Sequence, residues 1–239
     1  MNLYVTTSDK GIQIIEAFQY IFNNICKQNI IKNVFVLGFT PPKFKLDHNF
    51  KFISLGKDEG PQAFTNDMFN FFSQIDDQQF IITPDDTPPI KINEDLLSLA
   101  QNITKNNNFG RMCLTADIVT WSNHYTIEKS FDTFDVIKKH DNSDFKLSLV
   151  FSIWNKSYFV ENLQRLKNCN PWQFEVDGYI KNDKTPIYGF AKQYPAHILH
   201  FYKRGHKKPN WDKCNYFPNA VYLNQTEKEY CDKLLPTSL

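Results

Sequence analysis

Two adjacent carboxylates, Asp85 and Asp86, follow a run of apolar residues in the stretch FIITPDDTPP (80–89). Carboxylate oxygens are the ligands that Mg²⁺ and Mn²⁺ prefer, and these ions leave coordination positions open for the phosphates of a substrate. Adjacent acids also occur at three other places: Asp58-Glu59, Asp76-Asp77 and Glu94-Asp95. On spacing alone, a solvated turn is therefore the better interpretation of Asp85-Asp86.

In NPWQFEVDG (170–178), the acid Glu175 follows two aromatic residues, Trp172 and Phe174. Asn170 can cap a helix, and the proline and glycine of this stretch suit the start and the end of a short one. An acid that is desolvated by neighbouring aromatics acquires a raised pKa, as a general base at neutral pH needs. The alternative is that Trp172 and Phe174 are core residues while Glu175 faces water, and without further context this alternative is favoured.

Basic side chains are densest in YKRGHKKPNW (202–211), in a chain whose formal net charge is only +1. Such a cluster suits a diphosphate, although an ordinary basic surface loop has the same composition. His197 and His200 lie just upstream, and either can ligate a metal, although a histidine near aromatics is more often structural. The basic cluster comprises Lys203, Arg204, His206, Lys207 and Lys208.

Other catalytic fingerprints are missing from the sequence. It contains no G-x-G-x-x-G, no G-x-x-x-x-G-K-[ST], no H-E-x-x-H and no G-x-S-x-G. Nucleotide-dependent redox, P-loop, zincin and α/β-hydrolase chemistry therefore lack their motifs.

The elements that must position these residues alternate between strand and helix through about residue 115. The apolar patterns predict strands over 2–7, 33–40, 50–56, 80–83 and 111–121, and helices over 12–26, 61–75 and 93–103. Alternation of this kind predicts an α/β fold with a mostly parallel sheet, and the 50–56 strand, which alternates most, is expected near an edge. Ligands of such sheets bind at the carboxyl ends of strands. Thr6 to Asp9 and Asp85-Asp86 both occupy such ends, which separates this acidic pair from the other three.

The second half of the chain is less regular. We expect a strand over KLSLVFSIW (146–154), a helix over 157–166 and a short helix over 170–178, followed by a segment rich in tyrosine and histidine (194–211). No repeat and no linker-like stretch separates the two halves. We therefore predict one domain over 1–239, with subregions 1–115 and 116–239.

The amino-acid composition is that of a folded protein without a strong net electrostatic field. The chain has 239 residues, of which 41% are hydrophobic, and 27 basic side chains balance 26 acidic ones. Neither nucleic acid nor an anionic membrane is an expected partner. Five widely spaced cysteines without a C-x-x-C, the lack of a signal-like start and the lack of an 18-residue apolar run predict reduced thiols, no transmembrane segment and a cytoplasmic location.

Taken in order, these motifs resemble a family of GT-A-type glycosyltransferases of bacteria and large DNA viruses. The resemblance spans about residues 2–211, and its most specific part is SIWNKSYF (152–159) combined with NPWQFE (170–175). The other matching segments are the turn from Thr6 to Asp9, the glycine turn and aromatic helix from Gly60 to Ile75, the strand and acidic pair from Phe80 to Asp86, and the Tyr/Lys/Gly/Trp segment that ends at Trp211.

The resemblance implies a GT-A-like, Rossmann-like fold that transfers a sugar from a nucleotide diphosphate-sugar to an acceptor hydroxyl. Residues 1–115 would bind the donor, and 116–239 would form a smaller acceptor-side half with a C-terminal closing segment. Glu175 matches the position of the catalytic acid of inverting members, which predicts inversion at the anomeric carbon, and Trp172 would stack on the acceptor. The implied donor-binding residues are Thr6, Thr7 and Asp9 near the base and ribose, Asp85 and Asp86 near the ribose, metal and diphosphate, and Lys203, Arg204 and Trp211 in the closing segment.

One departure concerns the metal. A D-x-D motif that ends at Asp86 needs a carboxylate at position 84, where this chain has Pro84. The expected Mn²⁺ or Mg²⁺ then depends on Asp86, with Asp85 and His200 as further candidate ligands.

Two other functions remain open at the level of sequence. One is a sugar nucleotidylyltransferase, although MNLYVTTSDKG lacks the glycine-rich phosphate loop of that class. The other is a non-catalytic protein of the same fold that binds nucleotide-sugars or glycans.

Overall fold

A nine-stranded sheet forms the centre of the computed structural model, which describes residues 1–106, 108–121, 124–141, 143–178, 183–203, 205–212 and 223–238. The strand order is β3-β2-β1-β4-β9-β6-β10-β8-β7. In chain order these strands are β1 (Leu3–Thr6), β2 (Val34–Gly38), β3 (Phe50–Ser54), β4 (Gln79–Pro84), β6 (Arg111–Cys113), β7 (Tyr125–Ser130), β8 (Asp135–Lys139), β9 (Ser152–Asn155) and β10 (Ile187–Ala191).

Most strands of this sheet point the same way. The pairs β1-β2, β1-β4, β2-β3 and β6-β10 are parallel, whereas β9 runs against β4 and β6, and β8 runs against β10 and β7. Strands of both halves of the chain share the sheet, which continues across residue 115. The predicted α/β fold with a mostly parallel sheet is confirmed, and the 50–56 strand is at the edge, as expected.

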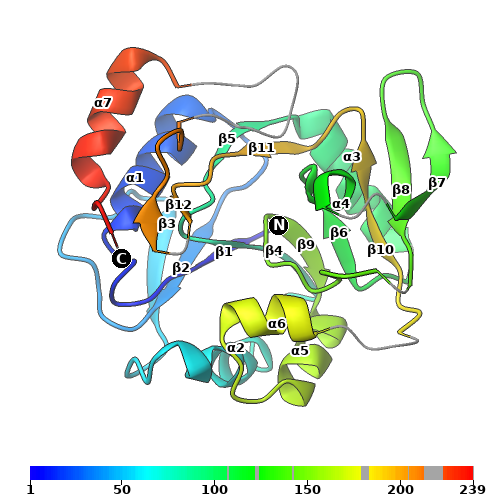
Figure 1. Cartoon of the computed structure of the whole chain (residues 1–239), viewed down its shortest axis with the longest axis horizontal. Coiled ribbons are helices and arrows are strands. Elements are labelled where there is room, and N and C mark those ends of the chain that lie inside the picture. The colour runs from blue at the N-terminus through cyan, green and yellow to red at the C-terminus, as the bar shows by residue number, and fades with distance from the viewer. Residues whose placement is uncertain are drawn as a thin grey trace.

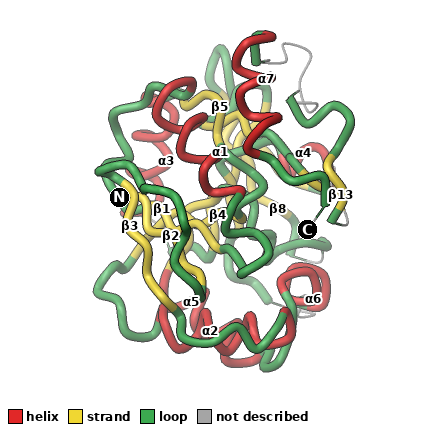
Figure 2. The backbone as a smooth tube through the Cα atoms, turned by 90° about the vertical axis from the view of Figure 1, so that its left-hand side faces the viewer, coloured by secondary structure: helices red, strands yellow, loops and turns green. Residues whose placement is uncertain are grey.

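Helices cover both faces of the sheet (Figures 1 and 2). Figure 2 shows α2, α5 and α6 on one side and α1, α3 and α7 on the other. The helices are α1 (Ile14–Tyr20, continued by a π-helical turn at Ile21–Ile25), α2 (Phe64–Phe72, preceded by a 3₁₀ turn at Pro61–Ala63), α3 (Glu94–Asn106), α4 (Asp117–Trp121), α5 (Lys156–Arg165), α6 (Pro171–Asp177) and α7 (Gln225–Leu234). None of the helices in the described part of the chain is long and apolar enough to cross a membrane.

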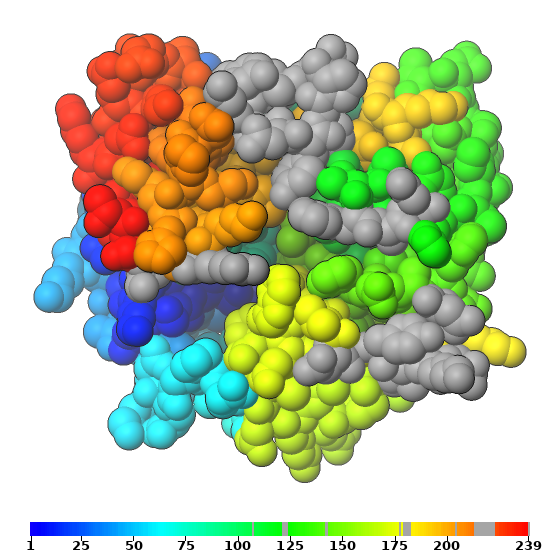
Figure 3. Space-filling model, in the orientation of Figure 1, coloured from blue at the N-terminus to red at the C-terminus, as the bar shows by residue number. Residues whose placement is uncertain are grey.

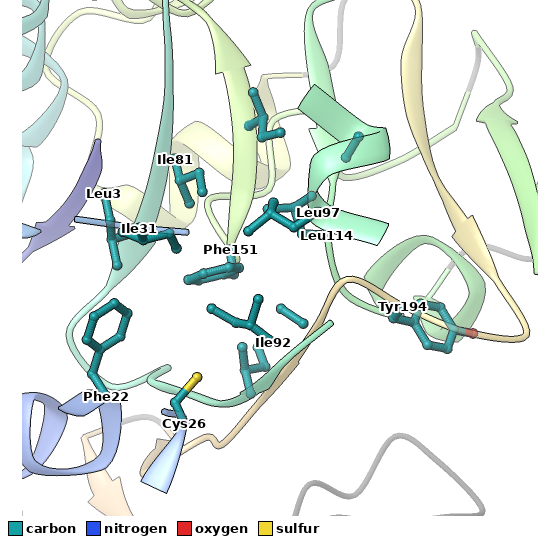
Figure 4. Packing of buried hydrophobic residues seen from close by; sticks show 14 of the residues in the cluster. Leu3, Phe22, Cys26, Ile31, Ile81, Ile92, Leu97, Leu114, Phe151 and Tyr194 are labelled. Atoms are coloured by element: carbon teal, nitrogen blue, oxygen red, sulfur yellow. The ribbon is translucent and has the colours of Figure 1, made fainter. Parts of the chain in front are cut away.

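Each face of the sheet has its own apolar core. On the α1 and α3 side, Leu3, Phe22, Ile81, Leu97 and Phe151 are fully buried and point toward one another (Figure 4). On the other side, Phe72 of α2, Phe80 of β4, Trp154 of β9 and Phe159 of α5 form a second cluster of aromatic rings. Because β1 and β4 are buried on both faces, their sequences are continuous apolar runs.

Two predicted strands are shorter than expected, and the difference matters for the site. Of 111–121 only β6 is a strand, because the chain turns at Thr115, whose Oγ1 accepts the Asp117 amide at 3.4 Å, and enters α4. Of 146–154 only 152–154 is extended, in β9. The buried stretch before it is irregular, because the Ser148 carbonyl and the Leu149 amide bond to side chains instead of a strand.

Several elements have no strong local signal and were not predicted. These are the hairpin β7-β8, strand β10, helix α7, and two small sheets formed by β5 (Pro89–Ile92) with β11 (Ala196–Ile198) and by β12 (Tyr202–Lys203) with β13 (His206–Lys207). Of the predicted thiols, Cys26, Cys113, Cys169 and Cys231 are free, and Cys214 lies outside the described residues.

Candidate active site at the carboxyl edge of the sheet

The carboxyl ends of β1 and β4 lie side by side. Thr6 pairs with Pro84 at the last position of both strands, and the Asp85 amide donates to the Thr6 carbonyl at 3.0 Å. Each chain then leaves the sheet, so that Thr7 and Asp85 emerge as neighbours. Both segments were expected at carboxyl ends of strands, and the structure places them at the ends of two adjacent strands.

Asp85 is held by the turn that follows β1. The Thr7 hydroxyl donates to Asp85 Oδ2 at 2.6 Å. Gly11 lies so close that a Cβ at this position would be 2.2 Å from Asp85 Oδ2 and 2.9 Å from Thr7 Oγ1. A side chain at position 11 would therefore displace the Asp85 carboxylate or the Thr7 hydroxyl from its present place.

Both carboxylates of the pair are half-buried and hard to ionise. Burial and the neighbouring charge of Asp86 raise the pKa of Asp85, whereas its hydrogen bond from Thr7 lowers it. Burial also raises the pKa of Asp86, and the charge of Lys208 acts in the opposite direction. Two acids in this situation favour a shared proton or a cation between them.

A C-terminal segment, 196–211, passes over this edge. The Phe201 amide donates to the Asp86 carbonyl, and the Leu199 amide donates to the Pro88 carbonyl, each at 2.9 Å. This pairing brings His200, Tyr202 and Lys208 to the acidic pair. Burial and the charge of Lys208 lower the pKa of His200 to about 4, so its imidazole is neutral at pH 7. A neutral imidazole is the form that can ligate a metal.

Glu175 reaches the same edge from α6. Strand β9 begins at Ser152, which pairs with both Ile82 of β4 and Cys113 of β6, so the residues before it lie at the carboxyl ends of those strands. One of them, Leu149, donates its amide to Glu175 Oε1 at 2.6 Å. Figure 3 shows α6 (yellow) and the segment around residues 200–211 (orange) on one face of the molecule.

The environment of Glu175 suits proton transfer. Burial raises its pKa to about 7, and the charges of Asp117 and Asp86 act in the same direction. The Leu149 amide and the charge of Arg111 lower it. Because the pKa is near neutrality, Glu175 can accept a proton in its charged form and hold it in its neutral form at working pH. Sequence reasoning alone favoured a solvent-facing Glu175, and the structure shows a half-buried one.

Two buried cations, Arg111 and Lys139, lie close enough for their charges to interact, and the charge of Arg111 also acts on Glu175. Arg111 of β6 is fully buried, and its Nη2 is 3.8 Å from Asp117 Oδ2. Lys139 of β8 is 3% exposed, and burial together with the charge of Arg111 lowers its pKa to about 8. Neither cation was predicted as a functional residue. The only sequence signal is a charged side chain within a strand-like apolar run, which is rare unless the charge is paired.

The remaining residues that were predicted to bind the nucleotide-sugar donor have varied surroundings. Asp9 accepts hydrogen bonds from the Thr40 amide at 2.8 Å and the Thr40 hydroxyl at 3.0 Å, so its carboxylate ties the ends of β1 and β2 together. Trp211 is 2% exposed, packs on Phe201 and donates to Asp232 Oδ1 at 3.1 Å. Lys203 is exposed on β12, and Arg204 lies outside the described residues.

Trp172, the predicted acceptor-binding residue, is 66% exposed. It lies three residues before Glu175 on α6, and residues at this spacing share a helix face. Phe145 is near it, with ring centroids 6.5 Å apart. An exposed indole beside a candidate base is well placed to stack on the apolar face of a sugar.

The carboxylate oxygens at this edge are compatible with a divalent ion whose remaining coordination positions are filled by a substrate. Within the described residues, no group of three or more Asp, Glu, His or Cys side chains gathers as a protein-only metal cage. Mg²⁺ is usually held by one or two carboxylates together with substrate phosphates, and Asp85 and Asp86, which resist ionisation without a cation, fit that mode.

Comparisons with known proteins find structural likenesses at low sequence identity. No known protein family matches the chain, and no curated protein is similar to it in sequence. The glycosyltransferase GlyE of Streptococcus pneumoniae is 9% identical, with a TM-score of 0.48, over 98% of this chain and 60% of that one. A UDP-glucose pyrophosphorylase complexed with UDP-glucose is 8% identical, with a TM-score of 0.44, over 83% and 92%. HddC of Yersinia pseudotuberculosis is 10% identical, with a TM-score of 0.43, over 84% and 93%. These values assign neither an activity nor a ligand to this chain.

Proposed function

We propose that this protein is an inverting glycosyltransferase, which moves a sugar from a nucleotide diphosphate-sugar to an acceptor hydroxyl. The observation that carries the proposal is the meeting of two unlike acidic groups at one edge of the sheet. Asp85 and Asp86 follow β4, and Glu175 is hydrogen-bonded to Leu149, three residues before the strand that pairs with β4. The first group suits a diphosphate with its cation, and the second suits a base.

The donor diphosphate is bound at Asp85 and Asp86. These carboxylates would hold a divalent ion, which would supply Lewis-acid stabilisation of the charge that develops on the leaving nucleotide diphosphate. Lys208, whose charge acts on Asp86, adds a protein cation on the same side. Thr7 and Gly11 keep the Asp85 carboxylate in place.

The acceptor is activated by Glu175. In its charged form it removes the proton from the acceptor hydroxyl as the oxygen attacks the anomeric carbon, the bond from that carbon to the diphosphate oxygen breaks, and the proton remains on Glu175. Trp172, on the same face of α6, holds the acceptor sugar by stacking. A single displacement of this kind inverts the anomeric configuration.

A panel of nucleotide-sugars tests the proposal. The protein is incubated with each donor and Mn²⁺ or Mg²⁺, and thermal unfolding and donor hydrolysis are measured. The proposal predicts that one donor class raises the unfolding midpoint and is slowly hydrolysed. Stabilisation by a donor without any turnover would point to a binding protein, and pyrophosphate release from a nucleoside triphosphate and a sugar phosphate would point to a nucleotidylyltransferase.

A further inference from the structure

One peptide group connects a buried cation to the candidate base. Arg111 Nη1 donates a hydrogen bond to the Ser148 carbonyl oxygen. The Leu149 amide donates to Glu175 Oε1 at 2.6 Å. The carbonyl of residue 148 and the amide of residue 149 belong to the same planar unit. Strand β6 and helix α6 thus hold this unit from its two ends.

The charges at the two ends support each other. A guanidinium at the carbonyl oxygen draws electron density toward that oxygen and makes the amide hydrogen a better donor. A carboxylate at the amide hydrogen makes the carbonyl oxygen of the same peptide a better acceptor. Hydrogen bonds arranged in series therefore strengthen one another. The direction of this effect agrees with the direct charge of Arg111, which also favours the ionised form of Glu175.

Stability alone gives a poor reason for an arginine at this position. Its side chain is 0% exposed, and its Nε and Nη2 make no hydrogen bond to any described residue. Asp117 is at 3.8 Å from Nη2, and the guanidinium lies 5.9 Å from the centre of the Trp154 ring. Incompletely paired buried ions are often less stabilising than apolar residues of similar volume.

We propose that Arg111 is the positioning residue of Glu175 and acts through the peptide group that joins Ser148 to Leu149. The inference builds on the proposed function, because it concerns the base of that reaction. The other charges that act on Glu175 are those of Asp117 and Asp86, and both disfavour its ionised form. Without Arg111, the Leu149 amide is the only described group that still opposes these two charges. Glu175 then binds its proton more tightly.

Carboxyl ¹³C NMR of the full chain tests this relation without any need for activity. The Glu175 signal is identified by its loss in Glu175→Gln, and its titration is followed in Arg111→Gln, Arg111→Lys and Lys139→Met. The midpoint is expected to rise by about one pH unit in Arg111→Gln. In Arg111→Lys, which keeps the charge, the midpoint of the Glu175 titration is expected to rise less. In Lys139→Met, which removes a buried cation that acts on Arg111 and has no described contact with either end of the peptide, the midpoint is expected to rise least. Equal shifts in Arg111→Gln and Lys139→Met would overturn the role of the peptide.

A measurement on the unaltered protein decides the matter if the Arg111 variants do not fold. The Leu149 amide and the Arg111 side-chain NMR signals should both titrate with the Glu175 midpoint, and an Arg111 signal that ignores this titration would refute the proposal. Kinetics separate the two proposals. If sugar transfer is present and the acidic limb of its pH profile is the same in Arg111→Gln, the positioning role fails while the transferase stands. If transfer is absent, the transferase fails, and the NMR titrations still decide the role of Arg111.

Discussion

Asp85 and Asp86 have different surroundings although they are adjacent in the chain. Asp85 accepts the Thr7 hydroxyl and is packed against Gly11, whereas Asp86 feels the charge of Lys208. Asp85 is therefore the fixed member of the pair, and Asp86 is the member that a cation from the C-terminal segment can balance.

Replacement of Thr7 tests how Asp85 is held. In Thr7→Val the carboxylate loses a hydrogen bond of 2.6 Å from a hydroxyl, and hydrogen bonds to charged groups contribute about 1.5–3 kcal/mol. Affinity for nucleoside diphosphate with Mn²⁺, measured by calorimetry, is expected to fall about tenfold or more. Thr7→Ser keeps the hydroxyl and serves as the matched control, with affinity near that of the parent. Equal affinities in the two variants would show that Thr7 does not support the site.

Sequence patterns predicted some site residues and not others. The pairing of Thr7 with Asp85 follows from two apolar runs that each end in polar residues, because parallel strands present their carboxyl ends together. Arg111 and Lys139 could not be predicted in this way, since only the fold brings Arg111 near Glu175 and Lys139 near Arg111. His200 was already named from the sequence as a further candidate ligand, and the hydrogen bond from the Phe201 amide to the Asp86 carbonyl brings the adjacent residue to the acidic pair.

Helix α6 determines where Glu175 lies. Asn170 forms a capping box with Gln173, which fixes the first turn. At the other end, a Cβ on Gly178 would be 2.2 Å from Leu147 Cδ1, so the helix end packs closely on the same stretch that bonds Glu175. A seven-residue helix has little stability of its own, and these two contacts supply what it lacks.

The capping box offers a matched pair of variants. Asn170→Ala removes the cap of α6, and Asn224→Ala removes the equivalent capping box of α7. Each is expected to lower the free energy of unfolding by about 0.5–2 kcal/mol in chemical denaturation. Sugar transfer is expected to fall severalfold more in Asn170→Ala, because only α6 carries Glu175. Similar losses of activity in both variants would mean that the placement of α6 is not what limits the reaction.

Elements were predicted best where their apolar pattern was long. The helices around 61–75, 93–103 and 157–166 and the strands at 2–7 and 33–40 were found within a few residues of their bounds. The stretch 146–151 was predicted as part of a strand from its apolar sequence, and its residues are buried except for the half-buried Val150. Burial is all that an apolar run indicates, and the side chains of Arg111 and Glu175 satisfy backbone groups that a strand would have paired.

At the scale of the whole molecule, a late segment of the chain lies against the edge of the sheet that the N-terminal strand β1 helps to form. Residues 196–211 return to the edge formed by β1 and β4. They are fixed there by α7, since Asp232 accepts hydrogen bonds from Trp211 and Lys207 at 3.1 and 3.0 Å, and α7 packs on α1. Trp211 thus stabilises the position of the segment from the inside, whereas its predicted contact with the donor stays a prediction.

Stability should depend on pH through Glu175. Its pKa is about 7 in the folded protein against 4.5 in the unfolded chain. The folded state therefore holds this proton more tightly, so the stabilisation is fully present below pH 4.5 and is lost as the pH rises to about 7. Relative to Glu175→Gln, the parent should lose about 1–3 kcal/mol over this window. Urea unfolding of both proteins from pH 4.5 to 8 measures the difference, and parallel curves would show that Glu175 does not titrate as described.

The base assignment is tested most directly by the rate of sugar transfer in Glu175→Gln, measured at saturating donor with nucleotide affinity determined on the same sample. Loss of a general base lowers rates about 10²–10⁴-fold. The expected result is a loss of this size with nucleotide affinity within about twofold of the parent, and a parent rate that rises with pH through about 7, as the pKa of Glu175 requires. Near-normal turnover in Glu175→Gln would contradict the account.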